Sequence, residues 1–289
     1  MNIGRRNLAV LLAVFAALIS ISALWGRIGE QERSGPVIYV APTLTGLVRE
    51  VLSRAPADSD VRVIGSVISV QLIREGRRPD VLLLADNELE RFLPDYRNRV
   101  SLGSYRLIAL CRENLTLNQL IERTIALADP NVAPIGYRAV AALYYLLKVQ
   151  DPAMSDRLQV LLGINVNPIE GGVLLDLRGL NPSRQFILRN DLSEVSAIFE
   201  AGLVDCIFVH EPFAMWKGLI GRYHVIDLPP EIEFTVDPPM RFIARLRVGD
   251  VEVRKFEASA VSFTERGDRI LEMMGTVELE RHGLMRVGP

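Results

Sequence analysis

Short apolar runs alternate with amphipathic stretches along the first part of the chain. Residues 37–40, 61–64 and 80–84 have the length and composition of buried strands, and stretches with a helical period follow the first two. Strand, loop and helix repeating in this order predict a parallel sheet covered by helices on both faces. The pattern therefore predicts an α/β fold.

The rest of the chain continues this alternation. At 289 residues it exceeds the usual size of one compact domain, which favours two lobes. We place lobe I at residues 36–113 and 225–289, and lobe II at residues 114–224. The further predicted strands are residues 107–111, 185–188, 206–209, 225–228 and 240–248, and the predicted helices are residues 44–54, 117–125, 137–149, 192–200 and 266–274.

The amino terminus carries an export signal. Arg5 and Arg6 precede an apolar stretch at residues 8–24, and a polar linker follows up to residue 35. The stretch, about 17 residues long, lies between a signal-peptide core and a full membrane span, so cleavage and retention as an anchor both stay open. The two arginines fit either the charged n-region of an ordinary signal peptide or a twin-arginine signal for the export route of folded proteins. We therefore expect the remainder at the extracellular face of the cell membrane.

Composition and charge limit the classes of function that the chain can have. Apolar residues make up 49% and charged residues 24%, as in folded globular proteins. The 33 basic and 35 acidic residues leave no basic field for nucleic acid, so we expect no nucleic-acid partner. The spacing of Cys111 and Cys206 matches no zinc-binding or redox motif. The two cysteines can either pack in the core or form a disulfide between adjacent strands.

Three loops place polar groups directly before a predicted helix. Thr43 and Thr45 follow the first strand, Ser66 follows the second, and Asp129 opens the segment that leads to Tyr137. Ligands of open α/β sheets bind beyond the carboxyl ends of strands, where helix N–H groups favour anions. Such residues are also ordinary helix caps. Three such loops in one architecture favour an anion site.

Residues 128–138 carry a specific motif: Ala-Asp-Pro-Asn, then Pro134, then Gly-Tyr-Arg. This motif resembles the Asp-Pro-Asn … Pro-x-Gly-Tyr-Arg signature of archaeal tungstate- and molybdate-binding proteins of ABC importers. Blocks at residues 65–67, 79–86 and 228–232 agree in order and spacing, and the resemblance covers most of residues 37–283. It implies a two-lobed type II periplasmic-binding-protein fold that binds an oxyanion between the lobes, needs no cofactor and delivers its ligand to permease subunits.

The resemblance also implies that two carboxylates approach the metal of the oxyanion. The first falls on Asp129. The second would fall on Val209, which is not a carboxylate. The nearest carboxylate is Glu211, two residues later, and the alternation of side chains along a strand would place it on the same face as Val209. It is equally open that Glu211 is a solvated carboxylate in a loop. Leu84 stands where the family often has a serine donor. The predicted ligand-binding residues are therefore Thr43, Thr45, Ser66, Asp129, Tyr137 and Glu211.

Other functions find less support. The chain lacks the GxSxG, P-loop, HExxH and GxGxxG motifs, so we expect a binding protein and not an enzyme. Leu84 and Val209 motivate an alternative, a divergent paralogue that keeps the fold but binds another anion or acts as a surface partner-binding module. Tyr137 and Arg138 open the predicted helix and could donate to ligand oxygens, but packing is equally open for Tyr137, and a surface ion pair is favoured for Arg138. We expect His210 to be structural or solvent-facing.

Overall fold

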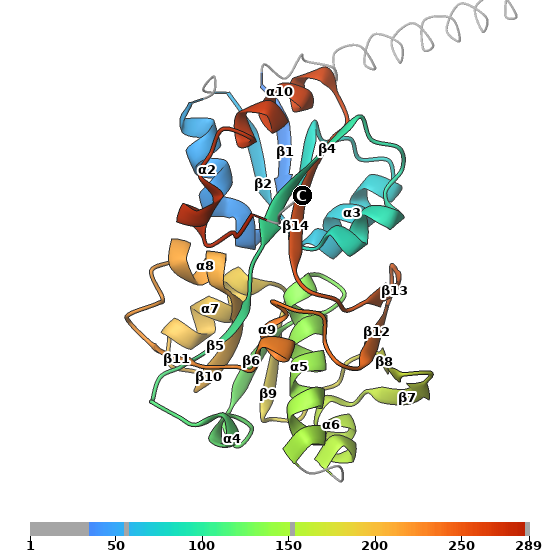
Figure 1. The fold of residues 1–289 in the computed structure, drawn as a ribbon, viewed down its shortest axis with the longest axis vertical. Helices are drawn as coiled ribbons and strands as arrows, with labels where there is room; N and C mark the ends of the chain where they lie inside the picture. The colour runs from blue at the N-terminus through green and yellow to red at the C-terminus, as the bar shows by residue number, and fades with distance from the viewer. Residues whose placement is uncertain (1–34, 55–57, 151–153, 287–289) are drawn as a thin grey trace, which may run out of the picture. The chain divides into compact units, whose positions relative to one another are not determined.

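Three sheets organise the chain. The computed structural model describes residues 35–54, 58–150 and 154–286, so the predicted export segment lies outside the described residues. Sheet A has the order β2-β1-β3-β14-β4, sheet B the order β11-β5-β10-β6-β9, and sheet C the order β13-β12-β8-β7 (Figure 1). The strands are β1 (Val37–Val40), β2 (Asp60–Val63), β3 (Val81–Leu84), β4 (Asn98–Ser104), β5 (Leu107–Cys111), β6 (Ile125–Ala128), β7 (Asn165–Ile169), β8 (Gly172–Asp176), β9 (Phe186–Arg189), β10 (Cys206–His210), β11 (His224–Ile226), β12 (Arg241–Leu246), β13 (Gly249–Glu252) and β14 (Glu257–Ser262).

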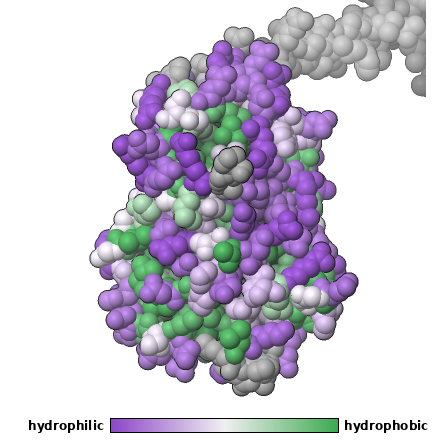
Figure 2. Space-filling view, viewed as in Figure 1, coloured by the Kyte–Doolittle hydropathy of each residue, from purple (hydrophilic) through white to green (hydrophobic). Residues whose placement is uncertain are grey.

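Helices connect and cover these strands. Helix α10 packs on β3, β4 and β14 of sheet A, and α7 packs on β6, β9 and β10 of sheet B. In the view of Figure 2, hydrophilic residues predominate over the half that carries sheet A, and patches of hydrophobic residues alternate with hydrophilic ones over the half that carries sheet B. The helices are η1 (Pro42–Leu44), α2 (Thr45–Ser53), α3 (Ser66–Arg74), η2 (Asn87–Phe92), α4 (Leu117–Leu120), α5 (Pro134–Gln150), α6 (Met154–Leu162), α7 (Leu192–Glu200), α8 (Glu211–Trp216), α9 (Pro230–Glu233), α10 (Glu265–Met274) and η3 (Leu279–His282).

Two expectations about these elements are wrong. Sheet A is mixed, because β14 runs antiparallel to both β3 and β4, although β1, β2 and β3 are parallel as predicted. The helix predicted at residues 117–125 ends at Leu120, and Ile125–Ala128 is a fully buried strand of sheet B. A four-residue apolar run fits a buried strand or a buried helix, and its neighbours in the sheet decide which forms.

The chain leaves sheet A at one place, for sheet B, and returns to it at another, from sheet C. It leaves sheet A after β4 and enters sheet B at β5, so Tyr105 lies in the first crossing; it re-enters sheet A at β14, and Phe256 lies just before that strand. The two rings stack with centroids 4.6 Å apart, and both are fully buried. The crossings therefore pack against each other. The lobe boundaries drawn from the sequence remain a prediction.

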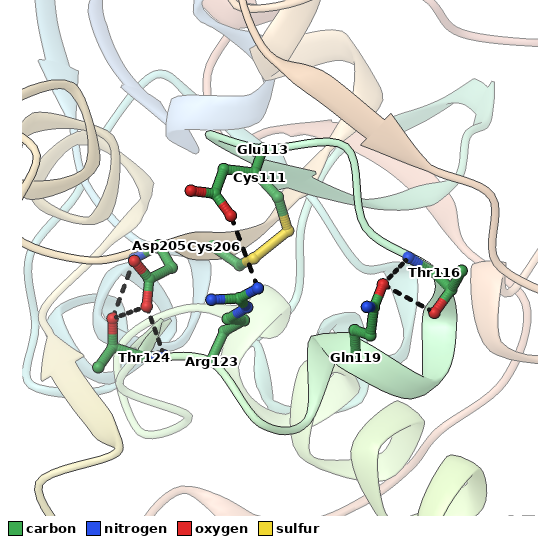
Figure 3. Close-up of a disulfide and its surroundings, with 8 residues drawn as sticks. All are labelled: Cys111, Glu113, Thr116, Gln119, Arg123, Thr124, Asp205 and Cys206. Atoms are coloured by element: carbon green, nitrogen blue, oxygen red, sulfur yellow. Dashed lines mark hydrogen bonds and ion pairs between the residues drawn. A yellow bond between two sulfur atoms is a disulfide. The ribbon is translucent and has the colours of Figure 1, made fainter.

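A disulfide joins two neighbouring strands of sheet B. Cys111 of β5 and Cys206 of β10 are directly opposed in the antiparallel register and form a bond that closes a segment with a sequence separation of 95 (Figure 3). Beside it, the Asp205 carboxylate accepts hydrogen bonds from the backbone N–H and the hydroxyl of Thr124, at 3.0 and 2.7 Å. Of the two possibilities for these cysteines, the disulfide is the one present.

Replacing both cysteines by alanine should destabilise the protein. A bond that closes so long a segment restricts the unfolded chain, so we expect a loss of about 2–5 kcal/mol in the free energy of unfolding, measured by urea denaturation. Reduced wild-type protein is the matched control, because it keeps the sulfur atoms but lacks the bond. Equal stability of the reduced and oxidised forms would contradict the expectation.

Candidate functional site

The carboxyl ends of four strands meet between sheets A and B. Thr43 and Asp86 follow β1 and β3 of sheet A, Tyr137 lies on the helix that follows β6, and His210 ends β10 of sheet B. In open α/β proteins this is where ligands bind. We call the buried polar residues gathered here the strand-end cluster: Thr43, Ser66, Asp86, Tyr137, Arg138 and His210.

Two glycines allow the helices to start this close together. A β-carbon at Gly65, directly before α3, would overlap the carbonyl oxygen of Val132, which accepts a hydrogen bond of 3.1 Å from the backbone N–H of Val67. A β-carbon at Gly136, in the first turn of α5, would overlap the carbonyl oxygen of Ala128. Only glycine permits these close backbone contacts without displacement.

A fully buried ion pair lies within the cluster. The carboxylate of Asp86 accepts a hydrogen bond of 2.6 Å from Arg138 Nη2, and both side chains have an exposed fraction of 0%. The same oxygen accepts a hydrogen bond from the hydroxyl of Tyr137, and Arg138 Nη1 donates to the carbonyl of Arg254. The guanidinium carbon lies 4.0 Å from the centroid of the Phe256 ring. Sheet A and α5 are thus joined through charge, hydrogen bonds and a cation–π contact.

The surroundings fix the protonation of both donors. Burial raises the pKa of Tyr137 well above its usual 10, and the charge of Asp86 adds to this, so Tyr137 stays a hydroxyl donor. Burial alone would lower the pKa of Arg138, but the charge of Asp86 opposes it and the pKa lies above the usual value. Arg138 is therefore a permanent cation, and its predicted place on the surface is wrong.

His210 forms the second link between the sheets. Its Nδ1 lies 2.6 Å from the Thr43 hydroxyl, and its ring packs edge-on against Tyr105 and Phe256, with centroids 4.9 and 4.6 Å away. Burial, followed by the charge of Arg138, lowers the pKa of His210 well below 6.5. His210 is therefore neutral and interior, which agrees with a structural role and excludes a solvent-facing position.

The other two predicted hydroxyls, Ser66 of the cluster and the nearby Thr45, have hydrogen-bond partners in neighbouring backbone groups. Ser66 is fully buried, and its oxygen accepts a hydrogen bond of 3.0 Å from the backbone N–H of Ala85. Thr45 is also buried, and its hydroxyl donates to the carbonyl of Pro42 at 3.0 Å. Ser66 thus connects α3 to the end of β3, whereas Thr45 closes the turn that begins α2.

The two predicted carboxylates have protein partners as well. Asp129 is half-buried and accepts from the backbone N–H of Asn131 at 2.8 Å, the local capping role of such residues. Glu211 accepts from Arg106 Nη2 at 2.7 Å, and Arg106 also pairs with Glu233. The expectation that strand alternation positions Glu211 is wrong, because β10 ends at His210 and Glu211 begins α8.

Sequence reasoning missed the residues that carry the charge of the cluster. Asp86 and Arg138 belong to blocks recognised in the resemblance, but Asp86 was not predicted to contact a ligand, and for Arg138 a surface ion pair was favoured over a contact with the ligand. The available signal was a carboxylate two residues after a fully apolar strand, at the strand end where sites form.

No group of acidic, histidine or cysteine side chains in the described part of the chain could hold a metal ion. Within residues 35–54, 58–150 and 154–286, no helix is long and apolar enough to cross a membrane.

Comparisons with known proteins show the fold. No protein-family model matches the sequence, and no curated protein matches it. The periplasmic molybdate-binding protein of Azotobacter vinelandii is similar, with a TM-score of 0.60, 11% identity, and 88% of this chain and 100% of that chain covered. The sulfate-binding protein SubI of Mycobacterium tuberculosis H37Rv has a TM-score of 0.56, 11% identity, and 89% and 88% covered.

A third similar structure has a different role. The bromide-bound regulatory domain of HypT from Salmonella typhimurium has a TM-score of 0.50, 14% identity, and 85% of this chain and 96% of that chain covered. Identities this low show the fold and leave function to the site. The chain has the two-lobed α/β fold of type II periplasmic binding proteins, as predicted.

Removing the buried cation should strongly destabilise the protein. Arg138→Met leaves the Asp86 carboxylate buried without its charge partner, so we expect a loss of about 3–5 kcal/mol in the free energy of unfolding, measured by urea denaturation. Arg54→Met is the matched control, because Arg54 pairs with Glu50 on the surface, where ion pairs contribute little. Equal losses in both variants would argue against the buried pair.

The neutral His210 should make stability depend on pH. The unfolded chain takes up a proton near pH 6.5 that the folded protein does not, because burial lowers the pKa of His210 in the folded state. Stability contributed by this group is therefore present above pH 6.5 and is lost as the pH falls, by about 1.4 kcal/mol per pH unit. His210→Gln should reduce the difference in unfolding free energy between pH 7.5 and 5.5 by about this amount, whereas the exposed His224→Gln should not.

Proposed function

We propose that this protein is the extracellular solute-binding component of an ABC importer and binds tungstate, molybdate or a similar oxyanion between sheets A and B. The observation that carries the proposal is the convergence of hydroxyl groups and helix starts at the carboxyl ends of strands from both sheets. The fold is shared with proteins named for binding molybdate and sulfate, which supports the proposal. The motif at residues 128–138 supports it independently.

The binding residues follow from the motif and the geometry. Thr43, Ser66 and Tyr137 contribute hydroxyl donors from η1 and from the first turns of α3 and α5, which meet at the cluster, and Thr45 begins α2 directly after η1. Helix starts add a favourable potential for an anion. Asp129 and Glu211 are the carboxylates proposed to approach the metal of the oxyanion. In the structure Asp129 caps a turn and Glu211 pairs with Arg106, so binding requires both carboxylates to change partners.

Access to the cluster requires the sheets to move apart, because its residues are buried. The crossings at Tyr105 and Phe256 are the covalent links about which such a hinge motion occurs. Capture then follows from closure around the ligand, and delivery to permease subunits follows from opening. The protein acts by binding and release, and catalysis is not part of the proposal.

Two features support an extracellular location, which a solute-binding protein requires. Disulfides persist mainly in oxidising surroundings such as the cell exterior, so the Cys111–Cys206 bond supports export. The predicted signal at residues 8–24 supplies the route, and when it is retained it tethers the protein to the membrane. We therefore propose a location at the extracellular face of the cell membrane.

Calorimetric titration of the purified full chain tests the ligand. Tungstate, molybdate or sulfate should bind, and Tyr137→Phe should weaken binding about tenfold or more, because it removes a donor to a charged acceptor. Tyr96→Phe is the matched control, since its hydroxyl faces Glu90 on the surface. Absence of heat with all three anions would reject the oxyanion and leave the alternative, a module that binds another anion or a partner.

A further inference from the structure

The carboxylate of Asp86 occupies the position of an anion within the cluster. It is fully buried and accepts hydrogen bonds from the Tyr137 hydroxyl, from Arg138 Nη2 at 2.6 Å and from the backbone N–H of Glu88 at 3.1 Å. A hydroxyl, a guanidinium and a backbone N–H are the donors that oxyanions accept from in proteins. Asp86 thus uses donors that a ligand in this cluster would need.

The charges of the cluster also indicate that Asp86 takes the place of an anionic ligand. The cluster contains one cation, Arg138, and one carboxylate, Asp86, and His210 is neutral. The negative charge of Asp86 raises the pKa of the neighbouring Glu88, after the larger effect of burial, so its field reaches adjacent groups. A doubly charged anion placed here would be attracted by Arg138 and repelled by Asp86, with nearly equal strength.

Two nitrogen atoms of the cluster have no hydrogen-bond partner in the described part of the chain. Within the described residues, Nε of Arg138 and Nε2 of His210 are buried without a hydrogen-bond partner. Both side chains contact the Phe256 ring, with Arg138 at 4.0 Å and His210 at 4.6 Å from its centroid. A buried nitrogen left unpaired is costly, so an acceptor that reached Nε of Arg138 would be favoured. The same holds for Nε2 of His210 in the tautomer in which Nδ1 accepts from the Thr43 hydroxyl and Nε2 carries the proton.

We propose that Asp86 is a resident anion that determines specificity: its carboxylate holds Tyr137 and Arg138 while no ligand is bound, and an incoming oxyanion displaces it from them. This inference rests on the proposed function. It makes Asp86 a built-in competitor that weakens binding, and weakens it more for a divalent than for a monovalent tetrahedral anion, because repulsion scales with ligand charge.

Asp86→Asn tests the competition. The amide keeps the size of the side chain and removes its charge, so molybdate should bind about tenfold more tightly or better, measured by calorimetry on the full chain. Perrhenate is a tetrahedral anion with a single charge, and the logarithm of its gain should be about half that of molybdate. Asp86→Glu, which retains the charge, is the matched control and should show no gain.

The outcomes separate this inference from the proposed function. Molybdate binding by the wild type without a gain in Asp86→Asn, or equal gains for both anions, overturns the inference and leaves the function standing. Absence of binding by both proteins overturns both proposals.

A measurement on the wild type covers the case in which Asp86→Asn does not fold. The side-chain nitrogen signals of Arg138 in NMR spectra of arginine-labelled protein should shift on addition of molybdate, because the guanidinium exchanges a carboxylate for the oxyanion. Unchanged Arg138 signals at a molybdate concentration that saturates the protein would overturn the inference.

Discussion

The buried ion pair between Asp86 and Arg138 is the constraint on which the rest of the cluster depends. Taking two charges out of water is costly, and the cost is offset only while each charge stays close to its partner and to further hydrogen bonds. This condition holds the end of β3 against the start of α5, where Gly65 and Gly136 permit the close backbone contacts. The pair therefore sets the distance between sheets A and B at the strand ends.

The same constraint explains how a ligand could control the two sheets. If the sheets separate, Arg138 and Asp86 lose each other and gain water; if they close on an oxyanion, Arg138 exchanges the Asp86 carboxylate for the oxyanion. A ligand shifts such an equilibrium only by its difference in affinity for the two states. Donors that become fully enclosed on closure, such as Tyr137 and Thr43, provide that difference.

Local elements could be predicted from the sequence, and distant pairings could not. Helices α2, α7 and α10 and strands β1, β3 and β5 lie where the apolar pattern places them, because each buries one stripe or one run of side chains. The antiparallel insertion of β14 between β3 and β4 depends on residues more than 150 positions apart in the sequence, which no local pattern encodes.

The candidate site was predicted in part. The hydroxyl loops and the motif containing Tyr137 were found, because they combine a strand end with a helix start. The positions of Arg138 and Glu211 were not, because arginine is usually exposed and because the start of α8 at Glu211 ends the strand alternation. Pairing of a buried charge with a residue 52 positions away appears only in three dimensions.

A crystal structure of the protein soaked with tungstate, with anomalous diffraction data collected at a tungsten absorption edge, would locate the bound oxyanion. We expect one strong tungsten peak between sheets A and B, with the oxygens of the anion within hydrogen-bonding distance of Tyr137 and Thr43. A well-diffracting crystal without a tungsten peak there, or with tungsten bound only elsewhere on the surface, would contradict this expectation.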